Sequence, residues 1–68
     1  MFSDEALQMI LTEAERIVRD AEMLLLKART TGEADLIEAA SNNLRLVIDN
    51  RDRLSRVFAL RPATQVLL

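Results

Sequence analysis

The chain has 68 residues, hydrophobic residues at 50% of its positions, no cysteine, no histidine and a net charge of −2. A chain this short forms one domain at most, with a small core. The absence of cysteine and histidine excludes disulfides, the usual zinc sites and catalysis by either side chain. The small negative charge gives no general attraction to nucleic acids or acidic membranes.

The first residues, MFSDEALQ, show no basic segment followed by an apolar one, so we expect no secretory signal. The longest apolar run, MLLLKA, is interrupted by Lys27 and is far shorter than the roughly 20 residues of a membrane span. We therefore expect a cytoplasmic protein.

A first helix is predicted over residues 4–29. Ser3 is a good N-cap and is followed by acidic residues, which suit the positive end of the helix dipole. Phe2 and Leu7 have the spacing of a hydrophobic staple.

The segment TTG at residues 30–32 is predicted to form the turn. Thr30 and Glu33 have the spacing of a capping box, which would start the next helix. Gly32 is the only glycine and suits a left-handed turn conformation.

A second helix is predicted over residues 33–61 and should end before Pro62, because proline lacks the N–H that continues a helix. Residues 1–61 then form one helical hairpin, and residues 62–68 form an apolar C-terminal tail without a clear structural signal.

Apolar residues recur in both helices at alternating spacings of three and four, which is typical of a coiled-coil seam. In the first helix the predicted seam consists of Leu7, Ile10, Ala14, Ile17, Ala21, Leu24 and Ala28. In the second it consists of Ile37, Ala40, Leu44, Val47, Arg51, Leu54 and Phe58.

Charge favours an antiparallel arrangement of these helices. Residues 1–15 carry four carboxylates and no basic side chain, whereas residues 45–61 carry five arginines and two aspartates. Residues 16–29 carry four basic and two acidic side chains, and residues 33–38 carry three acidic ones. An antiparallel hairpin brings opposite charges together at both ends. The predicted fold is therefore all-α, an antiparallel two-helix hairpin.

The two helices carry more apolar surface than one seam covers. The predicted surplus stripe contains Leu11, Val18 and Leu25 on the first helix, and Leu36, Ile48, Val57 and Leu46 on the second. Because two helices alone leave this surface in water, we expect a second copy or another helical protein to complete a four-helix bundle.

Arg51 is the one charged member of the predicted seams, and three interpretations stay open. It can pair with the acidic first turns of the first helix, set the register of a coiled coil, or contact a partner as a binding hot spot.

No motif indicates catalysis. The chain has no glycine-rich phosphate loop, its carboxylates lack the histidines of a two-metal bundle site, and no serine or threonine has a recognisable base. We expect no enzyme activity, no metal and no cofactor.

The segment MLLLKARTTGEADLIEAASNNLRLVIDNRDRLSRVFALR resembles the helix, break and helix of the small export chaperones of flagellar and type III secretion systems. Within it, LRLVIDNRDRL is similar to the partner-contacting region of the flagellar filament-cap chaperones. The resemblance implies a cytoplasmic hairpin that sequesters an aggregation-prone helical subunit. The contact residues that it implies are Leu44, Val47, Ile48, Asn50 and Leu54.

Three functions follow as hypotheses. The first is a chaperone or adaptor that lays its surplus apolar stripe on a helical partner. The second is a homodimeric four-helix bundle, phage-like or plasmid-like, that regulates or inhibits another protein. The third and least favoured is an RNA-binding bundle that uses Arg45, Arg53, Arg56 and Arg61, a set without stacking aromatics and diluted by aspartates.

Overall fold

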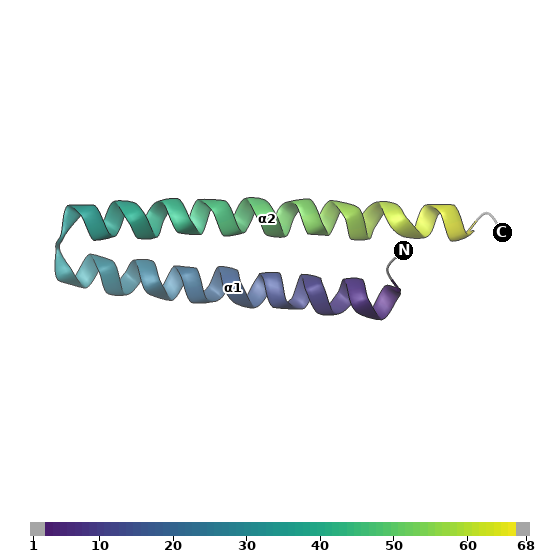
Figure 1. The fold of residues 1–68 in the computed structure, drawn as a ribbon, viewed down its shortest axis with the longest axis horizontal. Coiled ribbons are helices and arrows are strands. Elements are labelled where there is room, and N and C mark those ends of the chain that lie inside the picture. Colours follow the sequence, from purple (N-terminus) through teal and green to yellow (C-terminus); the bar gives the residue numbers. More distant parts are fainter. Residues whose placement is uncertain (1–2, 67–68) are drawn as a thin grey trace.

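The computed structural model describes the backbone of residues 3–66 and the burial of residues 3–60. It contains two helices, α1 (Asp4–Thr31) and α2 (Ala34–Val66), and no strand among the residues described. The helices run side by side in opposite directions, with the chain ends at the same end of the rod (Figure 1). The predicted all-α antiparallel hairpin is confirmed.

Ser3 begins α1 as predicted. Its φ of −74° and ψ of 164° are extended, and its side-chain oxygen accepts a hydrogen bond of 3.1 Å from the N–H of Ala6. The N–H of Leu7 donates to the Ser3 carbonyl at 3.0 Å. The proposed staple between Phe2 and Leu7 lies outside the described residues, because Phe2 is not among them.

The turn uses Gly32 as predicted but not the predicted capping box. Gly32 has φ 73° and ψ 6°, in the left-handed region, and its N–H donates to the Arg29 carbonyl at 3.2 Å. The Thr30 hydroxyl donates to the carbonyl of Lys27 inside the last turn of α1. Thr31 instead accepts the Glu33 N–H at 3.1 Å, because α1 extends to Thr31 and brings that hydroxyl to the loop.

The second helix does not end at residue 61 but continues through Pro62 to Val66. Proline inside a helix removes one backbone hydrogen bond and crowds the carbonyl four residues earlier, which weakens the helix, but its fixed φ is close to the helical value and the helix continues. The predicted tail, residues 62–68, is therefore helical up to Val66.

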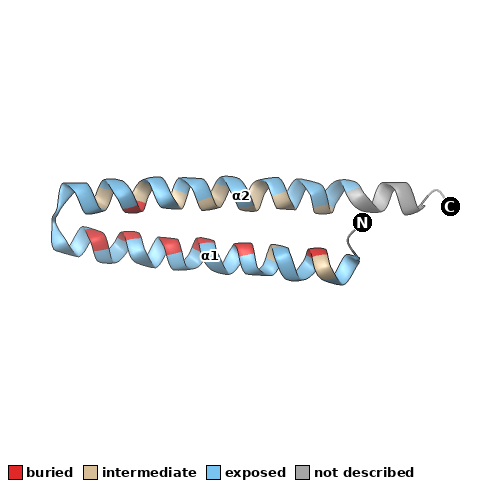
Figure 2. Ribbon diagram, in the orientation of Figure 1, coloured by how far each residue is buried: buried red, intermediate tan, exposed pale blue. Residues whose placement is uncertain are grey.

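The core is a single line of contact between the helices, and it is narrow. Seven hydrophobic residues of the described part are buried, and four of these are alanines. Leu25, Ala28 and Ala40 form a cluster on which Ile37 and Leu44 pack. In Figure 2 the buried positions of α1 face α2, and the half-buried positions of α2 face α1. The predicted seam of the second helix is confirmed, because none of its seven residues is exposed.

The predicted seam of the first helix is wrong in every second position. Its alanines and Leu7 are buried, but Ile10, Ile17 and Leu24 are 38%, 40% and 50% exposed. The inner positions are taken instead by the stripe that we expected outside, with Val18 and Leu25 buried and Leu11 half-buried. The two rows lie about 100° apart around the helix, on either side of the alanines, so one neighbouring helix covers only one of them.

The hairpin is a rod of 56 × 15 × 14 Å. Its radius of gyration is 16.0 Å, whereas a compact domain of the same length has about 11 Å. Its accessible surface is 5426 Å², against about 4,300 Å² for a compact protein of this mass. The chain thus exposes about 1,100 Å² more than a closed domain of its size.

Candidate protein-binding face

Large apolar side chains gather on one side of the rod, which we call the apolar face. The α1 row of this face is Ile10, Ile17 and Leu24, and the α2 stripe is Leu36, Leu46, Val57 and Leu60. These are seven of the ten large hydrophobic residues that are exposed in the described part. Seven large apolar side chains on one side are more than the singly scattered hydrophobic residues of an ordinary monomer surface.

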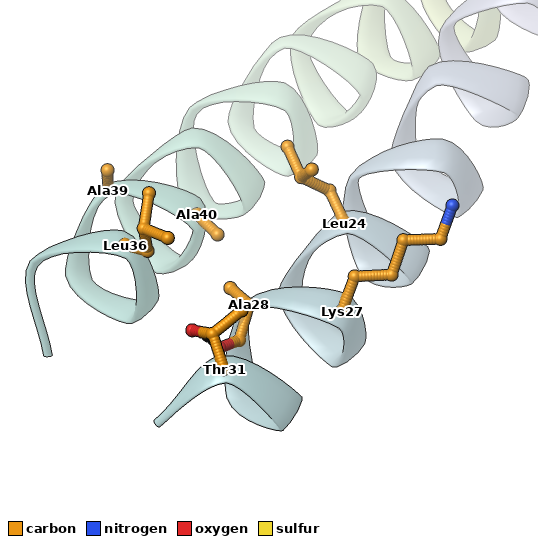
Figure 3. A pocket seen from close by; sticks show the side chains of 7 residues that line it. All are labelled: Leu24, Lys27, Ala28, Thr31, Leu36, Ala39 and Ala40. Atoms are coloured by element: carbon orange, nitrogen blue, oxygen red, sulfur yellow. Dashed lines mark hydrogen bonds between the residues drawn. The ribbon is translucent and has the colours of Figure 1, made fainter. Parts of the chain in front are cut away.

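An apolar pocket of about 320 Å³ near the turn joins the two rows of this face. Figure 3 shows Leu24, Lys27, Ala28 and Thr31 of α1 on one side of the pocket, and Leu36, Ala39 and Ala40 of α2 on the other. The small alanines leave the hollow between the two leucines, and the Lys27 side chain extends away from the alanines of α2 (Figure 3). Because Leu24 and Leu36 line one pocket, the α1 row and the α2 stripe lie on the same side of the hairpin.

The other side of α1 is polar. Its row at the same heptad spacing is Gln8, Glu15, Glu22 and Arg29. A second hollow on this side is lined by Glu22 and Arg29 together with Leu25, Leu26 and Leu44. The exposed row of α1 on this side is therefore more polar than its row on the apolar face.

Charged residues border the apolar face on α1. Arg16 pairs with Glu13, donating from Nε to Oε1 at 3.3 Å, and lies 3.6 Å from Asp20. The hydrogen bond and positive charge of Arg16 hold the pKa of Glu13 below its ordinary value, and Glu13 in turn raises the pKa of Arg16. All three side chains are exposed, so this network fixes side-chain positions at the rim and contributes little stability.

Arg51 does not pair with the acidic first turns of α1. Its Nε and Nη2 donate to Oδ1 of the adjacent Asp52 at 3.2 and 3.1 Å, and its side chain is 36% exposed. Arg53 pairs with Asp49 at 2.8 Å, one turn earlier. These pairs neutralise two arginines of α2, which lowers the positive charge that this part of the helix offers to a polyanion.

The residues predicted to bind a partner lie mostly between the helices. Val18 and Leu25 are buried, and only Asn50 is exposed. The half-buried ones are Leu11, Leu44, Val47, Ile48, Arg51 and Leu54. The prediction that Leu11, Val18 and Leu25 form an outward stripe is wrong, because α2 covers them. On α2, three of the four residues that we expected outside the seam are exposed: Leu36, Leu46 and Val57.

Sequence reasoning missed Leu60 on α2 and the whole α1 row of the face, Ile10, Ile17 and Leu24. This α1 row and the inner row have the same spacing relative to the alanines, so periodicity alone ranks the two rows equally. The flanking rows do not discriminate either, because both are polar: Gln8, Glu15, Glu22 and Arg29 lie beyond the inner row, and Glu13, Asp20 and Lys27 lie beyond the exposed row.

Neither a metal-binding cluster nor a membrane-spanning helix occurs among the described residues. No group of three or more histidine, cysteine, aspartate or glutamate side chains is placed to hold a metal ion within that part of the chain. Neither helix, over the same residues, is long and apolar enough to cross a membrane.

Comparison with known proteins assigns no family. No family model, curated protein or solved structure matches the chain.

Proposed function

We propose that this chain is a non-enzymatic protein-binding module that packs its apolar face onto a helical surface. The observation that carries the proposal is the concentration of seven exposed large apolar side chains on one side of the hairpin. A helix pair of this kind lowers its free energy by burying that side against further helices, as in a four-helix bundle.

The shape of the chain supports the same proposal. A rod that exposes 5426 Å² has a core only one contact line wide, and more than half of its buried residues are alanines, which contribute little apolar area. Small domains without disulfides or metals commonly gain stability by association. A helical partner on the apolar face would supply the missing second layer.

A chaperone or adaptor is the form of this function that the sequence resemblance suggests. In that form a helical export subunit covers the apolar face of the hairpin and is itself kept from aggregating. The second form is a homodimeric four-helix bundle that regulates another protein, and the regular heptad spacing of the exposed rows favours it.

A pair of charge substitutions tests the use of the face. Leu24→Glu places a carboxylate on the apolar face, and Leu26→Glu places the same group on the polar side, where Leu26 is 56% exposed. The measurements are light scattering on a sizing column and thermal melting by circular dichroism, both over a wide range of protein concentration.

We expect the wild type either to associate, with a melting temperature that rises with concentration, or to stay partly unfolded until a partner is added. Leu24→Glu should weaken the association or the response to a partner, and Leu26→Glu should not. A wild-type chain that is a fully helical monomer at every concentration, with an unchanging melting temperature, would refute the proposal.

A further inference from the structure

We infer that the surface covering the apolar face is a second copy of this chain, with α2 packed antiparallel on α2 of the second copy about a twofold axis at the level of Ile48. This inference rests on the proposed function, since it names the partner that the face binds. It is carried by a second heptad pattern on α2, by the charges within that pattern and by the accessible area of the hairpin.

The second pattern, which we call the outer seam, runs along the exposed side of α2. Its positions are spaced alternately by three and four residues over seven turns, as in a coiled coil. They are Leu36, Ala39, Asn43, Leu46, Asn50, Arg53, Val57 and Leu60, and all eight are exposed. The inner seam, which packs on α1, is a separate set of residues, so α2 has the pattern of a helix with two neighbours.

The outer seam matches itself when it is reversed. In an antiparallel coiled coil each layer of the core joins an a position of one helix to a d position of the other. Once one such pair is chosen, all other pairs follow. The register with the greatest overlap pairs Leu36 with Leu60, Ala39 with Val57, Asn43 with Arg53 and Leu46 with Asn50 of the second copy. Apolar residues then meet at both ends, Asn43 meets Arg53 further in, and Leu46 lies against Asn50 at the centre. A twofold interface requires such self-complementarity.

Charge favours the antiparallel arrangement over the parallel one. In a parallel pair, Arg53 of one copy faces Arg53 of the other inside the seam, and like charges at an interface are strongly unfavourable. In the antiparallel pair, Arg53 faces the Asn43 amide, whose carbonyl accepts hydrogen bonds. Arg53 also keeps its pair with Asp49, which lies on the same helix at 2.8 Å.

The same axis serves the α1 row. Leu25 and Ala28 pack with Ala40, Ile37 and Leu44, and continuing this antiparallel pairing places Ile17 level with Ile48. Because a twofold axis at this level pairs each residue beside it with its own copy, Ile17 lies opposite Ile17 of the second copy.

The remaining residues of the face find apolar partners about this axis. Ile10 of one copy lies level with Leu24 of the other, beside the pocket near the turn. Val57 and Leu60 of the second copy lie at that end too, where they would cover the hollow next to Leu36.

The area available fits a stable dimer. Each chain exposes about 1,100 Å² more than a compact protein of its mass, and an ordinary specific interface buries about 800 Å² of each partner, so the hairpin has enough excess surface for such an interface.

Engineered cysteines test the arrangement, because the natural chain has none. Three variants are compared under mild oxidation: Asn43→Cys, Arg53→Cys and the double variant. In the antiparallel dimer the two changed positions face each other, whereas each position is about 15 Å from its own copy along the axis. A disulfide needs Cα atoms roughly 4.4–6.8 Å apart. We expect the double variant to form a covalent dimer and the single variants to stay uncrosslinked.

A second measurement does not depend on disulfide geometry. Leu46→Glu, near the centre of the outer seam, should raise the dimer dissociation constant about tenfold or more, because it replaces a large apolar side chain of the interface by a charged one that must lose its water. Leu26→Glu is the matched control and should leave the constant unchanged, and the helicity of both variants is followed by circular dichroism.

The outcomes separate this inference from the proposed function. Crosslinking of either single variant overturns the arrangement but leaves a protein-binding face. The same holds for a noncovalent dimer in which the double variant does not crosslink and Leu46→Glu has no effect. A partly helical monomer that folds only with a different helical protein also overturns the inference and leaves the proposed function. A fully helical monomer at all concentrations overturns both.

Discussion

The free energy of unfolding of the hairpin should depend on the handedness of the residue at position 32. Gly32 has φ 73°, and a Cβ added there meets no atom within 4 Å. The effect of a methyl group is therefore conformational rather than steric. Gly32→Ala places an L residue in the left-handed region, which costs about 1–2 kcal/mol. The same methyl group in a D-alanine favours that region, so it should stabilise by about 0.4–1 kcal/mol by restricting the unfolded chain.

Chemical synthesis of the 68-residue chain gives both forms, and urea unfolding followed by circular dichroism gives their free energies of unfolding. Gly32→Asn provides a third point, because asparagine tolerates the left-handed region better than alanine. The expected order of stability is D-alanine, glycine, asparagine and L-alanine. Equal effects of the two alanine enantiomers would refute the argument that φ at Gly32 controls the turn.

Three further predictions concern the cap, the core and the rim. Ser3→Ala removes the hydrogen bond to the Ala6 N–H and should lower the free energy of unfolding by about 1 kcal/mol in urea titrations; no change would mean that the cap contributes nothing. Leu25→Ala, at a side chain 9% exposed, should cost about 2–4 kcal/mol in the same titration, whereas Leu26→Ala, at 56%, should cost less than about 1 kcal/mol. Equal losses would contradict the placement of α1. Because Arg16 depresses the pKa of folded Glu13, the stability from this pair is present above the ordinary value of 4.5 and is lost as pH falls through the folded pKa. The melting temperature of Glu13→Gln should therefore fall less with acid than that of the wild type, and parallel curves would exclude a contribution of the pair.

Local signals made the hairpin predictable. Ser3 begins a helix because a short hydroxyl side chain caps it, and Gly32 ends one because only glycine adopts a positive φ without strain. The three-residue turn and the charge blocks of the two helices then predicted the antiparallel direction. Each of these depends on a few residues close in sequence or on a sum over many charges, so small errors in helix position do not change the result.

The predictions that failed depended on the rotation of α1 about its own axis or on the single backbone hydrogen bond that Pro62 removes. Which row of α1 faces α2 depends on the direction in which the turn at Gly32 sends the chain, and a rotation of about 100° exchanges Leu24 for Leu25. No pattern within α1 fixes that rotation. Likewise, Pro62 weakens a helix by a bounded amount, and the rest of the helix decides whether it continues.

The exchange of the two α1 rows changes which surface of the hairpin is exposed to a binding partner. With Leu11, Val18 and Leu25 inside, the exposed heptad row of α1 is Ile10, Ile17 and Leu24, and it lies beside the outer seam of α2. The exposed large apolar residues of α1 and most of those of α2 therefore lie on one side of the hairpin, interrupted on α2 by Asn43, Asn50 and Arg53. A face that spans both helices favours a partner that is itself two helices wide.

The chaperone and dimer forms of the proposed function compete for this face. A client that needs the face binds only the dissociated chain, so its apparent affinity falls in proportion to the fraction dissociated. If about one chain in a hundred is free, client binding weakens about a hundredfold. A chaperone thus requires a dimer that dissociates at the working concentration. A tight dimer instead leaves only its outward surfaces, including the row of Gln8, Glu15, Glu22 and Arg29, for contact with a target. The dissociation constant of the dimer therefore discriminates between a chaperone and a regulator.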